Sequence, residues 1–248
     1  MTAPVALRLS AVSKSFGGLR AVNAVDLAVR AGERRALIGP NGAGKTTLFN
    51  LIAGALPVTS GRITLFDTDV TRVAQHRRAA LGLARTFQIT NLFPALSVLD
   101  NVVLAAQART RARFSMLRPV SRFGEVEAAA REALAAVGLD DRAGARVERL
   151  SHGEQRQLEI ALALAGRPRV LLLDEPAAGL SQAEVRHMTA LLRSLDRAIT
   201  VLIIEHDKDM ALAIAEQVTV LHDGRVIADG SPEAVRANPA VREIYLGG

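Results

Sequence analysis

One eight-residue segment constrains the fold of this 248-residue chain more than any other: residues 39–46, with the sequence GPNGAGKT. It fits G-x-x-x-x-G-K-[ST] and lies between a short apolar run at 35–38 and a helical pattern at 46–54. Glycines let successive backbone N–H groups turn inward around phosphate, and the following helix directs its positive end at the same anion. The purely structural alternative is a glycine-rich turn with a surface lysine. In this context the segment predicts a phosphate-binding loop in an α/β protein.

Individual residues of the loop have predicted roles in binding nucleotide and metal. Lys45 should reach the β- and γ-phosphates of a nucleoside triphosphate, and the Thr46 hydroxyl should ligate Mg²⁺. ATP and Mg²⁺ are therefore the expected cofactors. The nucleotide-binding residues expected in this segment are Gly39, Asn41, Gly42, Ala43, Gly44, Lys45, Thr46 and Thr47.

A second apolar run, residues 170–173, ends in the two carboxylates of Asp174 and Glu175. In an open α/β sheet, ligands bind beyond the carboxyl ends of the strands. Asp174 suits Mg²⁺, directly or in its outer coordination sphere, and Glu175 suits a general base that polarises the attacking water. Two acids could also simply end a strand in solvent, but beside a phosphate loop they favour ATP hydrolysis.

Apolar runs and helical patterns alternate along the chain, which is typical of an α/β protein with a largely parallel central sheet. Residues 7–12 and 21–29 alternate like strands of an antiparallel edge, and 200–204 is a continuous apolar run like a buried parallel strand. Between residues 89 and 168 the pattern becomes helical. The helical segments expected there are 97–109, 125–137 and 151–165.

Composition narrows the class of protein. No apolar run reaches about 18 residues, so no membrane span is expected. The start lacks the pattern of a signal peptide, and the absence of cysteine excludes disulfides and thiolate metal sites. A cytoplasmic location is expected.

The net charge of +6 is carried almost entirely by arginine, which can reflect genome composition as easily as function, and no nucleic-acid partner is expected. A denser cluster is either a solvated face or a surface near lipid headgroups. Its members are Arg109, Arg111, Arg113, Arg118 and Arg122.

Further motifs resemble those of one family. Residues 150–155, LSHGEQ, resemble the LSGGQ signature of ABC ATPases, and Gln88 resembles the glutamine of their Q-loop. Residues 205–207, EHD, resemble the switch-histidine motif, and Phe16 lies where the family places an aromatic ring that stacks on adenine. Together with the phosphate loop and the acidic strand end, these positions resemble an ABC transporter ATP-binding subunit along the whole chain.

The resemblance implies one ABC ATPase domain over residues 1–248, with a P-loop NTPase fold. Residues 1–88 and 169–248 would form a RecA-like nucleotide-binding core with an antiparallel β edge. Residues 89–168 would form an inserted helical subdomain that carries the signature.

The resemblance also implies a working dimer, in which the signature of one subunit covers the nucleotide bound to the phosphate loop of the other. Ser151 and Gly153 would contact the γ-phosphate across that interface, and Phe16 would contact the base. The implied catalytic residues are Glu175, His206 and Gln88, and the residues implied near the metal are Thr46, Gln88 and Asp174.

Two departures from the family pattern have a local explanation. His152 and Glu154 replace the Gly and Gln of the common signature, and Ser181 replaces a common Asp. Ser151-x-x-Glu154 and Ser181-x-x-Glu184 each match a capping box at a helix start. Because a carboxylate beside a γ-phosphate would be repelled, we predict that Glu154 turns back to the backbone N–H of Ser151. His152 could lend a donor or be a surface imidazole, and a role for Ser181 beyond capping is open.

Several segments resemble one branch of the family, the ATP-binding subunits of branched-chain amino acid importers and their amide or urea relatives. They are residues 83–88, 158–160, 174–180 and 244–247, and the stretch 109–127 is similar to the larger of two such subunits. The implied partners are a second ATPase subunit, identical or not, membrane permease subunits and, indirectly, a periplasmic solute-binding protein. The implied location is peripheral, at the cytoplasmic face of the inner membrane.

Two other functions are compatible with the ATPase motifs: an ATPase subunit of a lipid or lipopolysaccharide exporter, and a non-transport ABC ATPase acting on DNA or the ribosome. The apolar connector at residues 89–96 also has two interpretations. It packs inside the helical lobe, or Leu92 and Phe93 line a groove for a permease helix.

Overall fold

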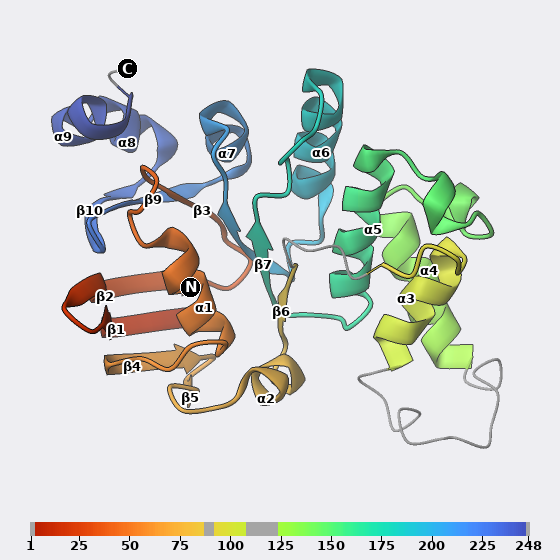
Figure 1. The fold of residues 1–248 in the computed structure, drawn as a ribbon, viewed down its shortest axis with the longest axis horizontal. Coiled ribbons are helices and arrows are strands. Elements are labelled where there is room, and N and C mark those ends of the chain that lie inside the picture. The colour runs from red at the N-terminus through yellow and green to blue at the C-terminus, as the bar shows by residue number, and fades with distance from the viewer. Residues whose placement is uncertain (1–2, 87–91, 108–123, 247–248) are drawn as a thin grey trace. The chain divides into compact units, whose positions relative to one another are not determined.

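The computed structural model describes residues 3–86, 92–107 and 124–246 and divides into two compact units (Figure 1). The first unit comprises Met1–Leu83, Arg169–Glu175 and Asp196–Gly248. The second unit comprises Ala84–Pro168 and Pro176–Leu195. The segment 176–195, which the sequence interpretation placed with the core, therefore has its contacts mainly in the helical unit.

The first unit contains an antiparallel sheet in the order β2-β1-β4-β5. Its strands are β1 (Val5–Phe16), β2 (Leu19–Arg30), β4 (Ser60–Leu65) and β5 (Thr68–Asp69). Along β2 and the first half of β1, buried and exposed residues largely alternate, because successive side chains of a strand point to opposite faces. The antiparallel edge expected from the alternating residues is thus present.

A six-stranded sheet has the order β10-β9-β3-β8-β7-β6. Its strands are β3 (Arg34–Ile38), β6 (Leu83–Arg85), β7 (Val170–Asp174), β8 (Thr200–Ile204), β9 (Gln217–His222) and β10 (Arg225–Gly230). Strands β7, β8, β3 and β9 pair in parallel, and every residue of β3, β7 and β8 is buried. These continuous apolar runs form parallel strands covered on both faces, as predicted.

Strand β3 nevertheless begins with arginine, and a polar network makes this burial possible. Arg35 is 3% exposed, and its Nε donates to Glu33 Oε1 at 2.6 Å. Its Nη1 donates to Thr219 Oγ1 at 2.8 Å and forms an ion pair with Asp229. The buried charge is therefore paired and hydrogen-bonded on several sides.

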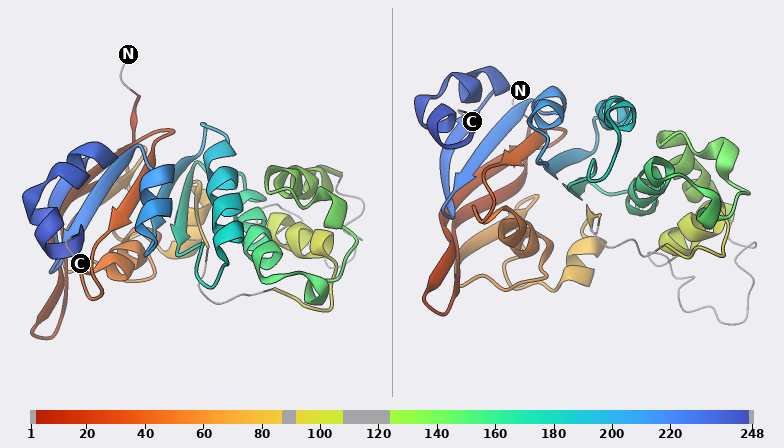
Figure 2. Two further views of the ribbon diagram at one scale, coloured as in Figure 1. Left: turned by 90° about the horizontal axis from the view of Figure 1, so that it is seen from above. Right: turned by 45° about the horizontal axis from the view of Figure 1, so that its top comes forward.

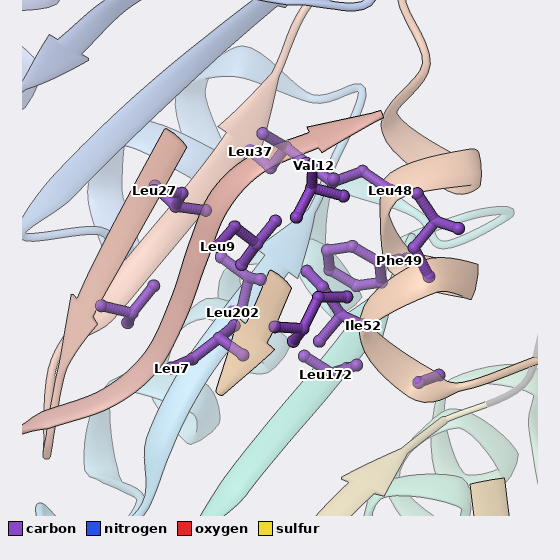
Figure 3. Close-up of a cluster of buried hydrophobic side chains, with 14 of the residues drawn as sticks. Leu7, Leu9, Val12, Leu27, Leu37, Leu48, Phe49, Ile52, Leu172 and Leu202 are labelled. Atoms are coloured by element: carbon purple, nitrogen blue, oxygen red, sulfur yellow. The ribbon is translucent and has the colours of Figure 1, made fainter. Parts of the chain in front are cut away.

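Helix α1 (Lys45–Ala53) follows the phosphate loop and packs into the main core of the first unit. Figure 3 shows Phe49 and Ile52 of α1 directed at Leu9 of β1 and Leu172 of β7. All four are 2% exposed or less, and burying such side chains stabilises the fold by about 1.5–3 kcal/mol each. The helix that follows the loop is thereby held firmly in place.

Helix α7 (Lys208–Ile214) packs on β3 in the first unit, and α8 (Pro232–Ala237) and α9 (Pro239–Val241) pack on β10 (Figure 2). The helices of the second unit include α3 (Val98–Gln107), α4 (Gly124–Ala136), α5 (His152–Leu164) and α6 (Gln182–Ser194). The first three pack pairwise and match the predicted helical segments within the described residues. No helix in the described part of the chain is long and apolar enough to cross a bilayer.

Arg78, in α2 (Gln75–Ala80), is a buried side chain that the sequence interpretation did not single out. Its Nη1 donates to the carbonyls of Leu51 and Ile52 at 2.7 Å each, and its Nε donates to that of Val73 at 2.9 Å. Leu51 and Ile52 lie in the last turn of α1, where carbonyls lack the usual N–H partner four residues further on; the Leu51 carbonyl also accepts from the Gly54 N–H at 3.2 Å. Gly54, with φ +78°, ends the helix, and a Cβ there would lie 2.7 Å from the Arg78 Nε. Arg78 thus caps the helix that follows the phosphate loop.

Replacing Arg78 with Met should lower the free energy of unfolding by about 3 kcal/mol or more, because several buried carbonyls lose their donor at about 1–3 kcal/mol each. Urea unfolding followed by circular dichroism measures this. The matched control is Arg77→Met on the exposed side of α2, expected to change stability by less than about 0.5 kcal/mol. Equal small effects of both variants would contradict the capping role.

Candidate functional site

The phosphate loop has the backbone geometry that its glycines allow. Gly39 and Gly44 have φ of 150° and 98°. A Cβ at Gly39 would lie 2.1 Å from the Leu221 carbonyl oxygen, and one at Gly44 would lie 2.3 Å from that of Ala21. Only glycine fits these two positions, where other strands pass directly against the loop.

Lys45 is folded into the loop that precedes it. Its Nζ donates to the carbonyls of Gly39 at 2.8 Å and Pro40 at 2.9 Å, and the residue is buried. Burial lowers the pKa of the Lys45 amine, and the nearby charge of Glu175 opposes that shift. The lysine thus provides a cation inside the loop, within electrostatic range of the carboxylate expected to act as a base.

The N-terminus of α1 is suited to an anion. Its N-cap is Gly44, no side chain accepts from its first N–H groups, and its first turn contains no acidic residue. By contrast, α5, α6, α7 and α8 begin with a Ser or Asp whose side chain caps the helix. Uncapped N–H groups and the positive end of the helix dipole favour phosphate at the start of α1.

Glu175 and His206 meet within the first unit. The Nε2 of His206 lies 3.0 Å from Glu175 Oε1, and because a carboxylate accepts, this ring nitrogen carries the proton. Glu175 has φ +50°, a conformation that costs a residue with a side chain about 1 kcal/mol. Its backbone N–H donates to the Ile204 carbonyl at 2.9 Å, which ties the two loops together. The predicted base and the predicted switch histidine are thus in direct contact.

Glu205 supports this arrangement and was missed as a functional residue in the sequence. It is buried, and its Oε2 accepts from the backbone N–H groups of His206 at 2.7 Å and Asp207 at 3.2 Å. Asp207 in turn caps α7 by accepting from Met210 at 2.9 Å. In the sequence, the position of this carboxylate directly after a buried apolar strand could have indicated this role.

The residues expected near Mg²⁺ lie in the first unit, apart from Gln88, which lies outside the described residues. Asp174 is buried at the end of β7, and Thr46 is exposed in the first turn of α1. Among the described residues, no group of three His, Cys, Asp or Glu side chains gathers to hold a metal. This donor set fits Mg²⁺, which keeps several waters and binds through one or two protein groups and substrate phosphates.

Phe16 ends β1, and its ring is accessible, with 47% of the residue exposed. The Lys14 Nζ lies 5.0 Å from the ring centroid, a cation–π distance. Strand β1 pairs with β2 to form a hairpin, and the carbonyl oxygen of Ala21 in β2 lies against Gly44 of the phosphate loop. An aromatic surface is therefore presented from the hairpin that adjoins the phosphate loop.

The signature segment starts α5 in the second unit, and the predicted capping box is confirmed. The Ser151 Oγ accepts from the Glu154 N–H at 3.2 Å, and Glu154 Oε2 accepts from the Ser151 N–H at 2.8 Å. Arg142 Nε donates to the other Glu154 oxygen at 3.0 Å. The hydrogen bond from Ser151 is the largest cause of the lowered pKa of Glu154. Both carboxylate oxygens of Glu154 thus have hydrogen-bond partners within the same chain.

Replacing Glu154 with Gln should leave ATP affinity nearly unchanged and lower stability by about 1 kcal/mol at neutral pH. Because folding lowers the pKa of Glu154, its stabilising effect is complete above the ordinary glutamate pKa and disappears as the pH falls through the lowered value. The stability difference between the two proteins should therefore shrink in acid. Urea unfolding at neutral and acidic pH and nucleotide titration check both points, and a large loss of ATP affinity would contradict them.

The remaining departures, Ser181 and His152, make contacts within the second unit. Ser181 caps α6 through a complete capping box with Glu184, as its sequence pattern predicted. The Nε2 of His152 lies 3.3 Å from the Ala178 carbonyl, which accepts from it. The imidazole therefore donates within its own subunit, to the segment that precedes α6.

Other predicted features fall partly outside the described residues. These include Gln88, residues 89–91 and the arginine cluster. Within the described part of the connector, Phe93 is 56% exposed, and its backbone N–H and carbonyl bond to the Asn101 side chain at 2.8 and 3.2 Å. Packing of the Phe93 ring inside the helical lobe is therefore wrong; the segment is held through its backbone, and the ring faces outward.

Two family models match the chain. The model described as ABC transporter matches residues 22–178, and that described as branched-chain amino acid ATP-binding cassette transporter matches residues 225–248. The high-affinity branched-chain amino acid transport ATP-binding protein BraF of Pseudomonas aeruginosa is 39% identical over 254 residues, which is 100% of this chain and 99% of the relative. The protein LivG of Escherichia coli, described in the same words, is 38% identical over 97% of each chain.

Solved structures of similar proteins agree with the fold. A nucleotide-free ATP-binding cassette from an ABC transporter has a TM-score of 0.85 and 29% identity, and the match covers 98% of this chain and all of that one. A dimeric ATP-binding cassette in a post-hydrolysis state, bound to ADP and phosphate, has a TM-score of 0.75 and 27% identity over 91% of this chain. The predicted fold class is confirmed by these similarities.

Proposed function

The chain belongs to the ABC transporter ATP-binding family, and from this premise we propose that it powers the uptake of branched-chain amino acids as a peripheral subunit at the cytoplasmic membrane face. The observation that carries the proposal is similarity over the full chain to importer subunits, together with the match of residues 225–248 to the branched-chain model. The prediction that this chain is the ATPase subunit of an ABC importer is confirmed at the level of the family. The lipid-exporter alternative is not favoured by these relatives.

We infer the following roles for the first unit as its nucleotide-binding core. The loop at residues 39–46 and the N-terminus of α1 would hold the phosphates, with Lys45 releasing its two carbonyl partners to bind them. Glu175 would take a proton from the attacking water, and His206, already bonded to Glu175, would keep the carboxylate aimed at that water. Thr46 would ligate Mg²⁺, and Asp174 would bind it directly or through water. The ion would neutralise charge on the phosphates.

We propose that the second unit acts on the nucleotide of a partner ATPase subunit. Ser151 caps α5, and Gly153 contributes a backbone N–H at the same helix start. A similar cassette is known as a dimer with ADP and phosphate, which supports this arrangement. Two signature segments would then close over two nucleotides.

The direct test is genetic. In a bacterium lacking the gene for this chain, uptake of radiolabelled leucine, isoleucine and valine should fall, and the intact gene should restore it while Lys45→Ala should not. Loss of urea or amide uptake with normal leucine uptake would reassign the solute to the related importers. Normal uptake of all these solutes would contradict the proposed function.

Replacing Phe93 with Ser should reduce transport at least tenfold while ATP binding by the isolated chain is retained, because the exposed ring is proposed to contact a permease helix. Uptake in cells and nucleotide titration of the purified chain measure the two effects. Leu104→Ser is the control, since Leu104 is also exposed in the helical unit but is not part of the connector at residues 89–96. Equal transport by both variants would remove Phe93 from the coupling surface.

A further inference from the structure

The ammonium group of Lys14 is fixed over one face of the Phe16 ring. Its Nζ lies 5.0 Å from the ring centroid, within the range of a cation–π contact. The same Nζ donates to the backbone carbonyl of Pro57 at 2.9 Å. Pro57 belongs to the connector of residues 54–59, which joins α1 to β4. The cation therefore has two partners, the aromatic ring on its own strand and a backbone acceptor in this connector.

Two further hydrogen bonds join the connector to the end of β1. The backbone N–H of Thr59 donates to the Ser13 carbonyl at 2.8 Å, and the Ser15 N–H donates to the Thr59 hydroxyl oxygen at 3.0 Å. The connector directly follows α1, the helix that begins at the phosphate loop, and all of these residues lie in the first unit. Lys14 is thus part of a junction that fixes the Phe16 end of β1 against the segment that follows α1.

The contact with Lys14 decides which face of the Phe16 ring is available. Because the ammonium group over the ring is bonded to Pro57, the covered face is directed toward the connector. Phe16 is nevertheless 47% exposed, and Leu19, its partner across β1 and β2, is exposed as well. A cation on one face draws the π electrons of the ring toward itself, which makes the opposite face less negative. That face is then better suited to stack on an electron-rich purine base.

We propose that Lys14 is a positioning residue for the nucleotide: it holds and polarises the Phe16 ring so that adenine stacks on the face opposite the ammonium group. The proposal rests on the proposed function and on the contact of Phe16 with the base that the family resemblance implies. In this role Lys14 acts through the ring and not on the phosphates. Its effect on affinity should therefore require both the base of the nucleotide and the ring of Phe16.

The test is calorimetric titration of the full chain with ADP, and with pyrophosphate as the matching ligand that lacks a base. Lys14→Met keeps the apolar stem and removes the charge, so ADP affinity should fall about two- to fivefold, as expected for a cation–π contact at an exposed site, while pyrophosphate affinity stays the same. Lys14→Arg, which keeps a cation, should restore most of the ADP affinity. The matched control is Arg20→Met, which removes the same charge from the same hairpin at a side chain that contacts Asn23, and it should leave ADP affinity unchanged.

A double-mutant cycle shows whether Lys14 acts through the ring. In a chain that already carries Phe16→Leu, Lys14→Met should cause no further loss of ADP affinity. Equal losses of ADP and pyrophosphate affinity, an unchanged ADP affinity, or the same loss with and without the ring would each overturn the positioning role and leave the proposed function intact. If Phe16→Leu alone left ADP affinity unchanged, both the base contact and the role of Lys14 would be overturned. Failure of the intact chain to bind ADP would instead contradict the proposed function itself.

Discussion

The Glu175→Gln variant should hydrolyse ATP at least about a hundredfold more slowly than the intact chain while binding it at least as tightly. Removing a positioned general base costs roughly 10²–10⁴ in rate. Glu175 is the carboxylate that contacts His206 and lies in the field of Lys45, so the substitution leaves the phosphate loop in place and removes one negative charge near the phosphates. Phosphate release and titration with a fluorescent ATP analogue separate the two effects.

Lys45→Ala is the contrasting variant for this prediction. It removes the cation from inside the loop, so nucleotide binding and hydrolysis should both be lost. If Glu175→Gln retained near-normal turnover, the general base would have to be sought elsewhere. If it lost binding as Lys45→Ala does, its carboxylate would act on the structure of the loop instead of on the water.

Hydrolysis should also be abolished by Ser151→Arg, at a position in the other unit. The long side chain would project from the N-cap of α5 toward the place proposed for the partner's nucleotide, and the dimer could not close. Loss of the cap itself costs only about 1 kcal/mol, so the chain should stay folded. Monomer binding of ATP should be unchanged, because the phosphate loop belongs to the first unit. Turnover assays, sedimentation with ATP and nucleotide titration measure the three properties.

The matched control is Ser231→Arg, which places the same side chain at a serine N-cap, that of α8 in the first unit. It should leave turnover largely intact. If both variants lost activity equally, the loss would follow from cap removal and not from a blocked interface. Normal turnover of Ser151→Arg would contradict the role of the signature across a dimer.

Features that depend on neighbouring residues were predictable from the sequence. The phosphate loop, the buried strands β7 and β8 and the capping boxes of α5 and α6 all follow from residues a few positions apart. Their physical causes are local: backbone freedom at glycine, the side-chain period of a strand, and the reach of a carboxylate over one helical turn. The motifs also indicated the family, because their order along the chain is itself a sequence property.

The contacts that join these motifs were decided only by the tertiary structure. His206 meets Glu175 across 31 positions, Arg78 caps α1 from α2, and Glu184 reaches Gly153 from another helix. None of these pairs has a spacing that local geometry prescribes, since each depends on which helices and strands pack together and at what distance. A buried arginine or an acidic helix start looks the same in sequence whatever it contacts. The packing of helices and strands determines which backbone group or side chain each of these charged groups contacts.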